Sequence, residues 1–296
     1  MNRNGQTVVV IGAGGGLGSG LAARFAAQGA TVVLAGIDTQ ELAGVERAVR
    51  ARGARAEVMR VDVADGDDVD AFARAVVARH GRVDLLCNTV GVGAQGQSWG
   101  LSMPSWHWQF DVNLFGAVHL NRAFVPAMIQ AGTGHVAHTV STSALTTHAG
   151  NPAYVASKHA LLSVCESLQQ DLRAAGAPIR VSAIVPGAIR SRMYEGHRHR
   201  QARYGAGEVD PAQIAASRDY LESFGADPDV LAGIVGGQLD AGLFYVFGRP
   251  EDRQYAARRC EDILRGTLSE PSFARVPGPG ARALQGADGN GPGGSR

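Results

Sequence analysis

The chain has 296 residues, 45% of them apolar, and a formal net charge of +1. This balance provides no general field for nucleic acid or anionic lipid, and no apolar run reaches the roughly 18 residues that cross a bilayer. Three scattered cysteines (Cys87, Cys165 and Cys260) argue against disulfides or a metal site. We expect a soluble protein without nucleic-acid or membrane partners and, because the polar start lacks signal-peptide features, a cytoplasmic location.

Apolar runs rich in β-branched residues alternate with segments of helical period. This alternation indicates a parallel sheet, and continuously apolar runs suit a sheet covered on both faces. The sequence therefore predicts an α/β fold, a single Rossmann-like doubly wound parallel sheet with helices on both faces. The expected strands are Thr7–Ile11, Thr31–Ala35, Ala56–Val61, Val83–Cys87, His135–Val140, Arg180–Val185 and Leu243–Phe247, with a final amphipathic helix over Asp252–Leu264.

A glycine-rich turn follows the first expected strand and precedes a helix running to about Gln28. Glycines there let the backbone approach a pyrophosphate, and a helix N-terminus offers unpaired N–H groups. The spacing fits G-x-x-x-G-x-G better than G-x-G-x-x-G, although a turn without a ligand is the alternative. The candidate phosphate-binding residues are Gly12, Gly14, Gly15, Gly16, Leu17 and Gly18.

Lys158 is the only lysine in a chain that otherwise uses arginine, and it follows Tyr154 by four positions. On a helix this spacing places both side chains on one face. A free phenol has a pKa near 10, and a nearby ammonium favours the phenolate, so the pair predicts a lowered pKa for Tyr154. The alternative is chance, with Tyr154 an ordinary half-buried aromatic.

Further motifs occur where the expected strands end. They are Asp62-Val63 after the third strand, Asn88-Thr89-Val90-Gly91 after the fourth, Asn113 in Asp111-Val112-Asn113-Leu114, Ser141 after the fifth, and Pro186-Gly187-Ala188-Ile189-Arg190-Ser191 after the sixth. With the glycine loop and Tyr154-Val155-Ala156-Ser157-Lys158, they resemble the classical short-chain dehydrogenase/reductase family over roughly residues 6 to 195.

The resemblance implies a catalytic tetrad of Asn113, Ser141, Tyr154 and Lys158. Tyrosine would exchange a proton with the substrate while hydride moves to or from nicotinamide, serine would hold the substrate oxygen, lysine would grip the ribose, and asparagine would hold a water or backbone link. Locally, Ser141 is also explained as a turn former and Asn113 as a cap. The implied cofactor contacts are the glycine loop with Ile37, Asp38, Asp62, Val63, Asn88, Gly91, Tyr154, Lys158, Pro186, Gly187, Ile189 and Ser191.

The end of the second strand bears on the choice of cofactor. Family members that bind NAD commonly place an acid at the position of Gly36, and those that bind NADP often place arginine at Ile37. Neither is present, and the glycine loop supplies no cation for a 2′-phosphate, whereas Asp38 could accept a ribose hydroxyl. We expect NAD in preference to NADP; Asp38 is equally well explained as a helix N-cap.

The remaining segments concern the substrate and partners. We expect a catalytic domain over residues 1–276 with a substrate lid at about 192–235, and a disordered Gly/Pro-rich tail over 277–296. The basic cluster 197–203 either meets an acidic substrate or forms a solvated face. Trp99 and His148 are candidate substrate contacts, whereas Trp106 and Trp108 suit packing. A homodimer through the helices around Asn113 and Tyr154 is expected, with a homotetramer as the alternative.

Taken together, these features predict an NAD(P)-dependent oxidoreductase that interconverts a secondary alcohol and a ketone on a moderately bulky small-molecule substrate. The fold alone does not establish this reaction, because enzymes with the same fold catalyse other reactions. The alternatives are a non-redox enzyme on the same fold (a dehydratase, epimerase or cyclase) and an NAD(P)-binding sensor or scaffold.

Overall fold

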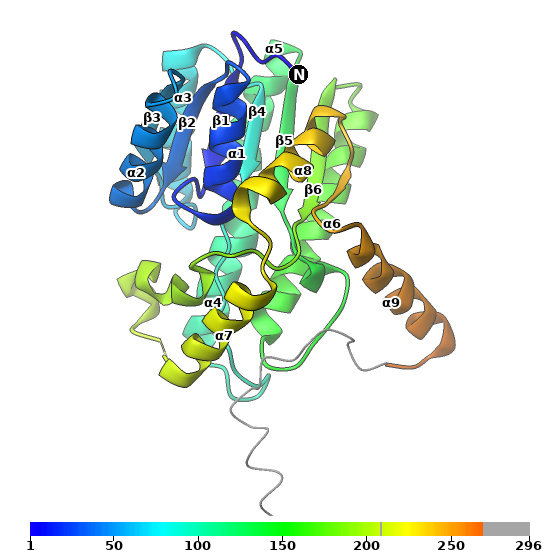
Figure 1. The fold of residues 1–296 in the computed structure, drawn as a ribbon. Coiled ribbons are helices and arrows are strands. Elements are labelled where there is room, and N and C mark those ends of the chain that lie inside the picture. Colours follow the sequence, from blue (N-terminus) through cyan, green and yellow to red (C-terminus); the bar gives the residue numbers. More distant parts are fainter. Residues whose placement is uncertain (208, 269–296) are drawn as a thin grey trace, which may run out of the picture.

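The computed structural model describes residues 1–207 and 209–268, which form a seven-stranded parallel sheet with helices on both faces (Figure 1). The strand order is β3-β2-β1-β4-β5-β6-β7, so the chain starts in the middle and winds outward twice, as predicted. The strands are β1 (Thr7–Ile11), β2 (Thr31–Gly36), β3 (Arg55–Arg60), β4 (Leu85–Asn88), β5 (Gly134–Thr139), β6 (Ile179–Val185) and β7 (Tyr245–Phe247).

The helices follow the strands in alternation, and the expected elements are confirmed with ends shifted by one or two residues. Four helices, α2, α3, α7 and α8, start at an aspartate N-cap whose carboxylate accepts backbone N–H groups of the first turn. The helices are α1 (Gly16–Ala27), α2 (Thr39–Arg50), α3 (Gly66–His80), α4 (Met103–Phe110), α5 (Gly116–Ala131), α6 (Pro152–Ala174), α7 (Pro211–Phe224), α8 (Pro228–Asp240) and α9 (Arg253–Arg265).

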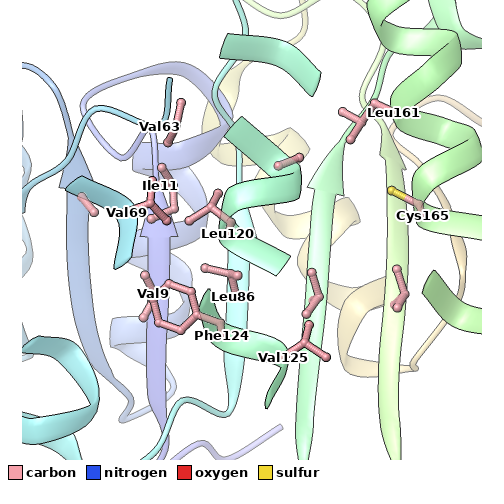
Figure 2. Close-up of a cluster of buried hydrophobic side chains, with 14 of the residues drawn as sticks. Val9, Ile11, Val63, Val69, Leu86, Leu120, Phe124, Val125, Leu161 and Cys165 are labelled. Atoms are coloured by element: carbon pink, nitrogen blue, oxygen red, sulfur yellow. The ribbon is translucent and has the colours of Figure 1, made fainter. Parts of the chain in front are cut away.

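The core consists of two apolar layers, one on each face of the sheet. Alternate side chains of a strand point to opposite faces, so Val8 and Val10 pack among α1, α2 and α8, whereas Val9 and Ile11 pack among α3, α5 and α6. Figure 2 shows the second layer, in which Phe124 of α5 lies against β1 and β4. Burial on both faces explains why these strands are apolar throughout.

Figure 1 shows α4 and α7 together below the sheet, and α9 extending away from the body of the fold. The lid range predicted at about 192–235 contains two short 3-10 turns, η3 (Met193–His199) and η4 (Ala202–Tyr204), then α7 and the first half of α8. The predicted tail, 277–296, and the end of the predicted domain lie outside the described residues. Among the described helices, none has the length and apolar character required to span a bilayer.

Candidate active site

The glycine loop joins β1 to α1 in a conformation that its glycines make accessible. Gly12 has φ +80° and Gly16 has φ +54°, the left-handed region that favours glycine. A Cβ at Gly18 would clash with the carbonyl oxygen of Gly12, so the helix packs directly on the loop. The N-cap of α1 is Gly15, which has no side chain to cover the first turn. This cradle fits a pyrophosphate.

Thr89 explains how the loop is held. Its hydroxyl donates to the carbonyl of Ile11 at 2.8 Å and lies 3.3 Å from that of Gly12, so the end of β4 fastens the loop that follows β1. The two strands pair in register, Ile11 opposite Asn88, which brings Thr89 to this point. The sequence departs from the family pattern at this position, yet the threonine makes a specific contact.

Asn113 lies in a π-helical turn, η1 (Asp111–Phe115), between α4 and α5. Its Oδ1 accepts the N–H of Val92 at 2.8 Å, and its Nδ2 donates to the carbonyl of Val92 at 2.9 Å and to the Ser157 hydroxyl at 3.1 Å. Such turns are frequent at functional sites. Asn113 thus links the loop after β4 to Ser157 of α6; its role in a proton relay stays a prediction.

Ser141 and Tyr154 meet at the carboxyl end of β5. Ser141 is the N-cap of the 3-10 turn η2 (Thr142–Ala144), where its Oγ accepts the N–H of Ser143 at 3.1 Å, and its hydroxyl lowers the pKa of the Tyr154 phenol in part. The Ser143 hydroxyl lies 3.1 Å from Nε2 of His148. Nδ1 of His148 lies 3.2 Å from the Ala149 carbonyl and must donate to it, so Nε2 accepts from Ser143.

Lys158 lies beneath Tyr154 on α6 and is 1% exposed. Its Nζ donates to the Thr139 carbonyl at 2.9 Å and lies 5.6 Å from the centre of the Tyr154 ring. A Cβ at Gly91 would lie 3.3 Å from Nζ, so glycine leaves room for the ammonium. Burial lowers the pKa of Lys158 to about 8.

The pKa of Tyr154 moves in the direction opposite to the sequence-based prediction. Burial raises it, and the hydrogen bond from Ser141 opposes this only in part. The predicted lowering by Lys158 is therefore wrong for this arrangement of the site. The reason is that desolvation of the phenolate outweighs the favourable contacts around it.

Asn88 is held by a buried chain of polar side chains. Its Oδ1 accepts the Val90 N–H at 3.1 Å, and its Nδ2 donates to Nδ1 of His138 at 3.3 Å, so Nε2 of His138 donates to Asn121 at 2.8 Å. Burial lowers the pKa of His138 to about 3, which keeps the ring neutral. Asn88 therefore shapes the loop after β4, including Gly91.

The loop after β3 lies under the segment that follows β6. The Asp62 carboxylate accepts the Ala64 N–H at 3.0 Å and the Gln201 side-chain amide at 2.8 Å, and Arg203 lies 3.5 Å from it. Val63 is buried and accepts a hydrogen bond from the His119 ring at 3.0 Å. The structure thus places Asp62 and Val63 at the same edge as the glycine loop.

The loop after β6 closes the other side. Pro186 is buried, and Gly187 has φ +77°, where a Cβ would clash with Arg249 and approach Asp252. Ile189 forms a parallel bridge with Ala226. A Cβ at Gly16 would lie 3.1 Å from Ser191, so this loop touches the glycine loop.

Asp38, which follows β2, has a structural role. The side chain is the N-cap of α2, and its Oδ1 accepts the amides of Gln40 at 2.9 Å and Glu41 at 3.1 Å. Ile37 lies beside it, half-buried. The alternative that Asp38 is a helix cap is therefore confirmed as a structural role.

The basic cluster 197–203 forms contacts within the molecule, which neither sequence-based alternative anticipated. Arg198 pairs with Glu41 and Glu195, and Arg200 stacks on Trp108 at 5.0 Å. Trp108 is 1% exposed, as packing predicts, whereas Trp99 is 84% exposed.

These features can be set beside known proteins. The family model for short chain dehydrogenases matches residues 6–202, two thirds of the chain. The chain belongs to the short-chain dehydrogenase/reductase family. The resemblance inferred from its motifs is confirmed, and the protein is an oxidoreductase of this family.

Three proteins illustrate the similarity. The 1-deoxy-11-beta-hydroxypentalenate dehydrogenase of Streptomyces exfoliatus is 33% identical over 274 residues, which cover 92% of this chain and 93% of the relative. A short-chain dehydrogenase/reductase structure from Burkholderia phymatum in complex with NAD is 31% identical, with a TM-score of 0.86, and covers 93% of this chain and 100% of that one. A metagenomic short-chain oxidoreductase in complex with NADP is 38% identical, with a TM-score of 0.60 and coverage of 63% and 84%.

Sequence reasoning missed several residues that shape this short-chain dehydrogenase site. The sequence pointed to Thr89, because this residue departs from the family motif. It also pointed to Ser157, because this residue stands between Tyr154 and Lys158. His138 and Glu41 carried no local signal, because their roles depend on contacts between segments that are distant in the chain.

Proposed function

We propose that this short-chain dehydrogenase is an NAD(P)-dependent enzyme that interconverts a secondary alcohol and a ketone on a moderately bulky organic molecule. The observation that carries the proposal is the buried Lys158, whose Nζ lies 5.6 Å from the centre of the Tyr154 ring and donates to the Thr139 carbonyl, two residues before Ser141. A buried ammonium is costly and is retained where chemistry requires it. The relative from Streptomyces exfoliatus, by its name a hydroxypentalenate dehydrogenase, supports the same class of substrate.

Each residue of the tetrad has a proposed task. When bound, the nicotinamide ring supplies or accepts hydride. Ser141 orients the substrate oxygen, and Tyr154 gives it a proton during ketone reduction or removes one during alcohol oxidation. The raised pKa keeps the phenol of Tyr154 protonated at neutral pH, which is the form that reduction needs. Lys158 holds the ribose hydroxyls, and Asn113 fixes the backbone at Val92.

The remaining cofactor contacts are proposed from their place along the cleft. The glycine loop and the first turn of α1 would bind the pyrophosphate, Asp62 and Val63 the adenine, and Ile37 and Asp38 the adenosine ribose. Residues after β4 and β6 would surround the nicotinamide: Asn88, Gly91, Pro186, Gly187, Ile189 and Ser191. We propose NAD as the preferred cofactor, since Gly36 and Ile37 supply no cation for a 2′-phosphate.

We further propose that residues 192–235 form the substrate lid and that the protein is a homodimer through α4, α5 and α6, with a homotetramer as the alternative. Phe115 at the start of α5 is 47% exposed and Ile129 at its end is 45% exposed, which suits a surface covered by a second copy.

Replacing Tyr154 by phenylalanine tests the mechanism. Tyr154→Phe removes the proton donor without changing the ring, so we expect reduction of bulky ketones with NADH to fall by a factor of about one hundred or more. The affinity for NADH, followed by nicotinamide fluorescence, should change little. Tyr245→Phe is the control, because that hydroxyl binds Glu166 at the edge of the sheet. Preserved ketone reduction in Tyr154→Phe would contradict the mechanism.

A further inference from the structure

The acid nearest the carboxyl end of β2 is Asp38, and it already serves as the N-cap of α2. In dinucleotide-binding folds an acidic side chain near this point accepts a hydrogen bond from the 2′-hydroxyl, and a cation nearby accommodates a 2′-phosphate instead. Here Gly36 and Ile37 carry no charge, and Asp38 Oδ1 is engaged by the first turn of α2. A second acid beside Asp38 would strengthen the distinction between the two cofactors.

Glu41 brings a carboxylate to this point from the first turn of α2. A Cβ added at Gly14 would lie 3.0 Å from Cβ of Glu41 and 3.1 Å from its Oε2, so the carboxylate lies directly against the glycine loop. That loop approaches the pyrophosphate, and the adjoining ribose must lie between it and the end of β2. The Glu41 side chain is 27% exposed, so it is not sealed off from solvent.

Two arginines from the segment after β6 hold this carboxylate. Nη1 of Arg192 and Nη2 of Arg198 each lie 3.3 Å from Oε1 of Glu41. Glu195 fixes both arginines in turn, at 2.8 Å and 3.1 Å. Arg192 is 151 residues from Glu41 in the chain, so the arrangement exists only in the folded protein.

The charge around Glu41 opposes a phosphate. The two arginines are balanced by Glu41 and Glu195. The Asp38 carboxylate lies within 4.8 Å of a Glu41 oxygen, and Nε2 of His199, charged only when protonated, lies 3.9 Å from Oε2 of Glu41. A monoester phosphate carries a charge of about −1.5 to −2 at neutral pH and needs cations that are not already neutralised. A ribose hydroxyl needs only an acceptor, which a carboxylate provides.

We propose that Glu41 is the residue that selects the cofactor: its carboxylate accepts a ribose hydroxyl of NAD and repels the 2′-phosphate of NADP. Arg192 and Arg198 position the carboxylate, and they become available to a 2′-phosphate when it is removed. This inference rests on the proposed function, because it requires a nicotinamide dinucleotide in the cleft. The proposal places the acid that selects the cofactor on α2, and the contacts of this acid with Arg192 and Arg198 connect it to the proposed lid.

The test is a pair of titrations, with NADH and with NADPH, followed by nicotinamide fluorescence. The wild type should bind NADH more tightly. Glu41→Gln keeps the size of the side chain but removes its charge, so we expect the ratio of the two dissociation constants to shift toward NADPH by at least about tenfold. Glu46→Gln is the matched control on α2, where Glu46 pairs with Arg50 at the surface, and its ratio should not change.

A third variant separates the contribution of the arginines. When Arg192→Gln and Arg198→Gln are added to Glu41→Gln, the gain in NADPH binding should disappear. Tighter binding of NADPH by the wild type would overturn the proposal, and so would an equal change in both dissociation constants in Glu41→Gln. Because the titrations need no turnover, they are independent of the proposed reaction: ketone reduction with NADPH alone would leave the reaction standing and refute the role of Glu41.

Discussion

Lys158 combines two properties that are normally incompatible, a charged side chain and nearly complete burial. The Thr139 carbonyl, at 2.9 Å, and the space left by Gly91 make the position tenable. Burial still lowers its pKa to about 8, so the group is close to losing its proton at neutral pH. An arginine would keep its charge, but its planar fork needs more room and several acceptors. This position therefore requires a side chain of the size of lysine as well as its positive charge.

Lys158→Arg tests this specificity. We expect the rate of ketone reduction to fall at least about tenfold, because the guanidinium cannot occupy the space beside Gly91 without displacing that backbone. The wild type should also bind NADH more weakly as the pH rises through about 8, since the ammonium proposed to hold the ribose loses its proton. Titrations by nicotinamide fluorescence at several pH values measure this. Lys158→Arg should show no such decrease; wild-type affinity that stays constant well above pH 8 would contradict the assignment.

At the scale of elements, the cleft depends on contacts between the ends of neighbouring strands. Thr89 after β4 holds the loop after β1, and Asn113 in the π-helical turn holds Val92, a few residues further along the same loop. Parallel strands place these loops at one edge of the sheet, and hydrogen bonds between side chains and backbone then fix their conformation. Removing one of these hydrogen bonds should therefore weaken cofactor binding more than it lowers the stability of the fold.

Thr89→Ala is expected to show this difference. Loss of the hydroxyl leaves the Ile11 carbonyl without this donor, which costs about 1 kcal/mol of unfolding free energy. The affinity for NADH should fall severalfold, because the glycine loop is no longer held at the spacing that the pyrophosphate needs. Thr89→Ser keeps the hydroxyl and is the control. Urea denaturation and NADH titration measure the two effects, and equal NADH affinity in Thr89→Ala and Thr89→Ser would contradict the proposed fastening.

Much of this arrangement could be predicted from the sequence because it is encoded locally. The apolar runs gave the strands, and the motifs after them placed Asn113, Ser141, Tyr154 and Lys158. What could not be predicted depends on packing. The pKa of Tyr154 rises because the site is buried, and no spacing of residues reports burial.

The same limit applies to contacts between distant segments. The role of Glu41 depends on Arg192, which reaches it from 151 residues away in the chain. Asp38 was the more obvious acid because it directly follows the strand, but the helix it begins uses its carboxylate as a cap.

At the scale of the whole molecule, the loops that carry the family motifs gather along the carboxyl edge of the sheet. The loops after β1, β3, β4 and β6 line it, and the segment after β6 covers it through Glu41 and Asp62. Under the proposed function, this cover would keep water away from a reacting hydride while the substrate enters beside Ser141 and Tyr154. This arrangement supports direct transfer between cofactor and substrate at one site.

The most direct test of the account is the transfer of deuterium from NADH labelled at C4 of the nicotinamide to a panel of bulky ketones. We expect the wild-type protein to form alcohols that carry the deuterium at the former carbonyl carbon, detected by mass spectrometry, and Tyr154→Phe to form almost none. Ketones converted without incorporation of the label from either face of the nicotinamide, or labelled alcohol formed equally well by Tyr154→Phe, would contradict the account.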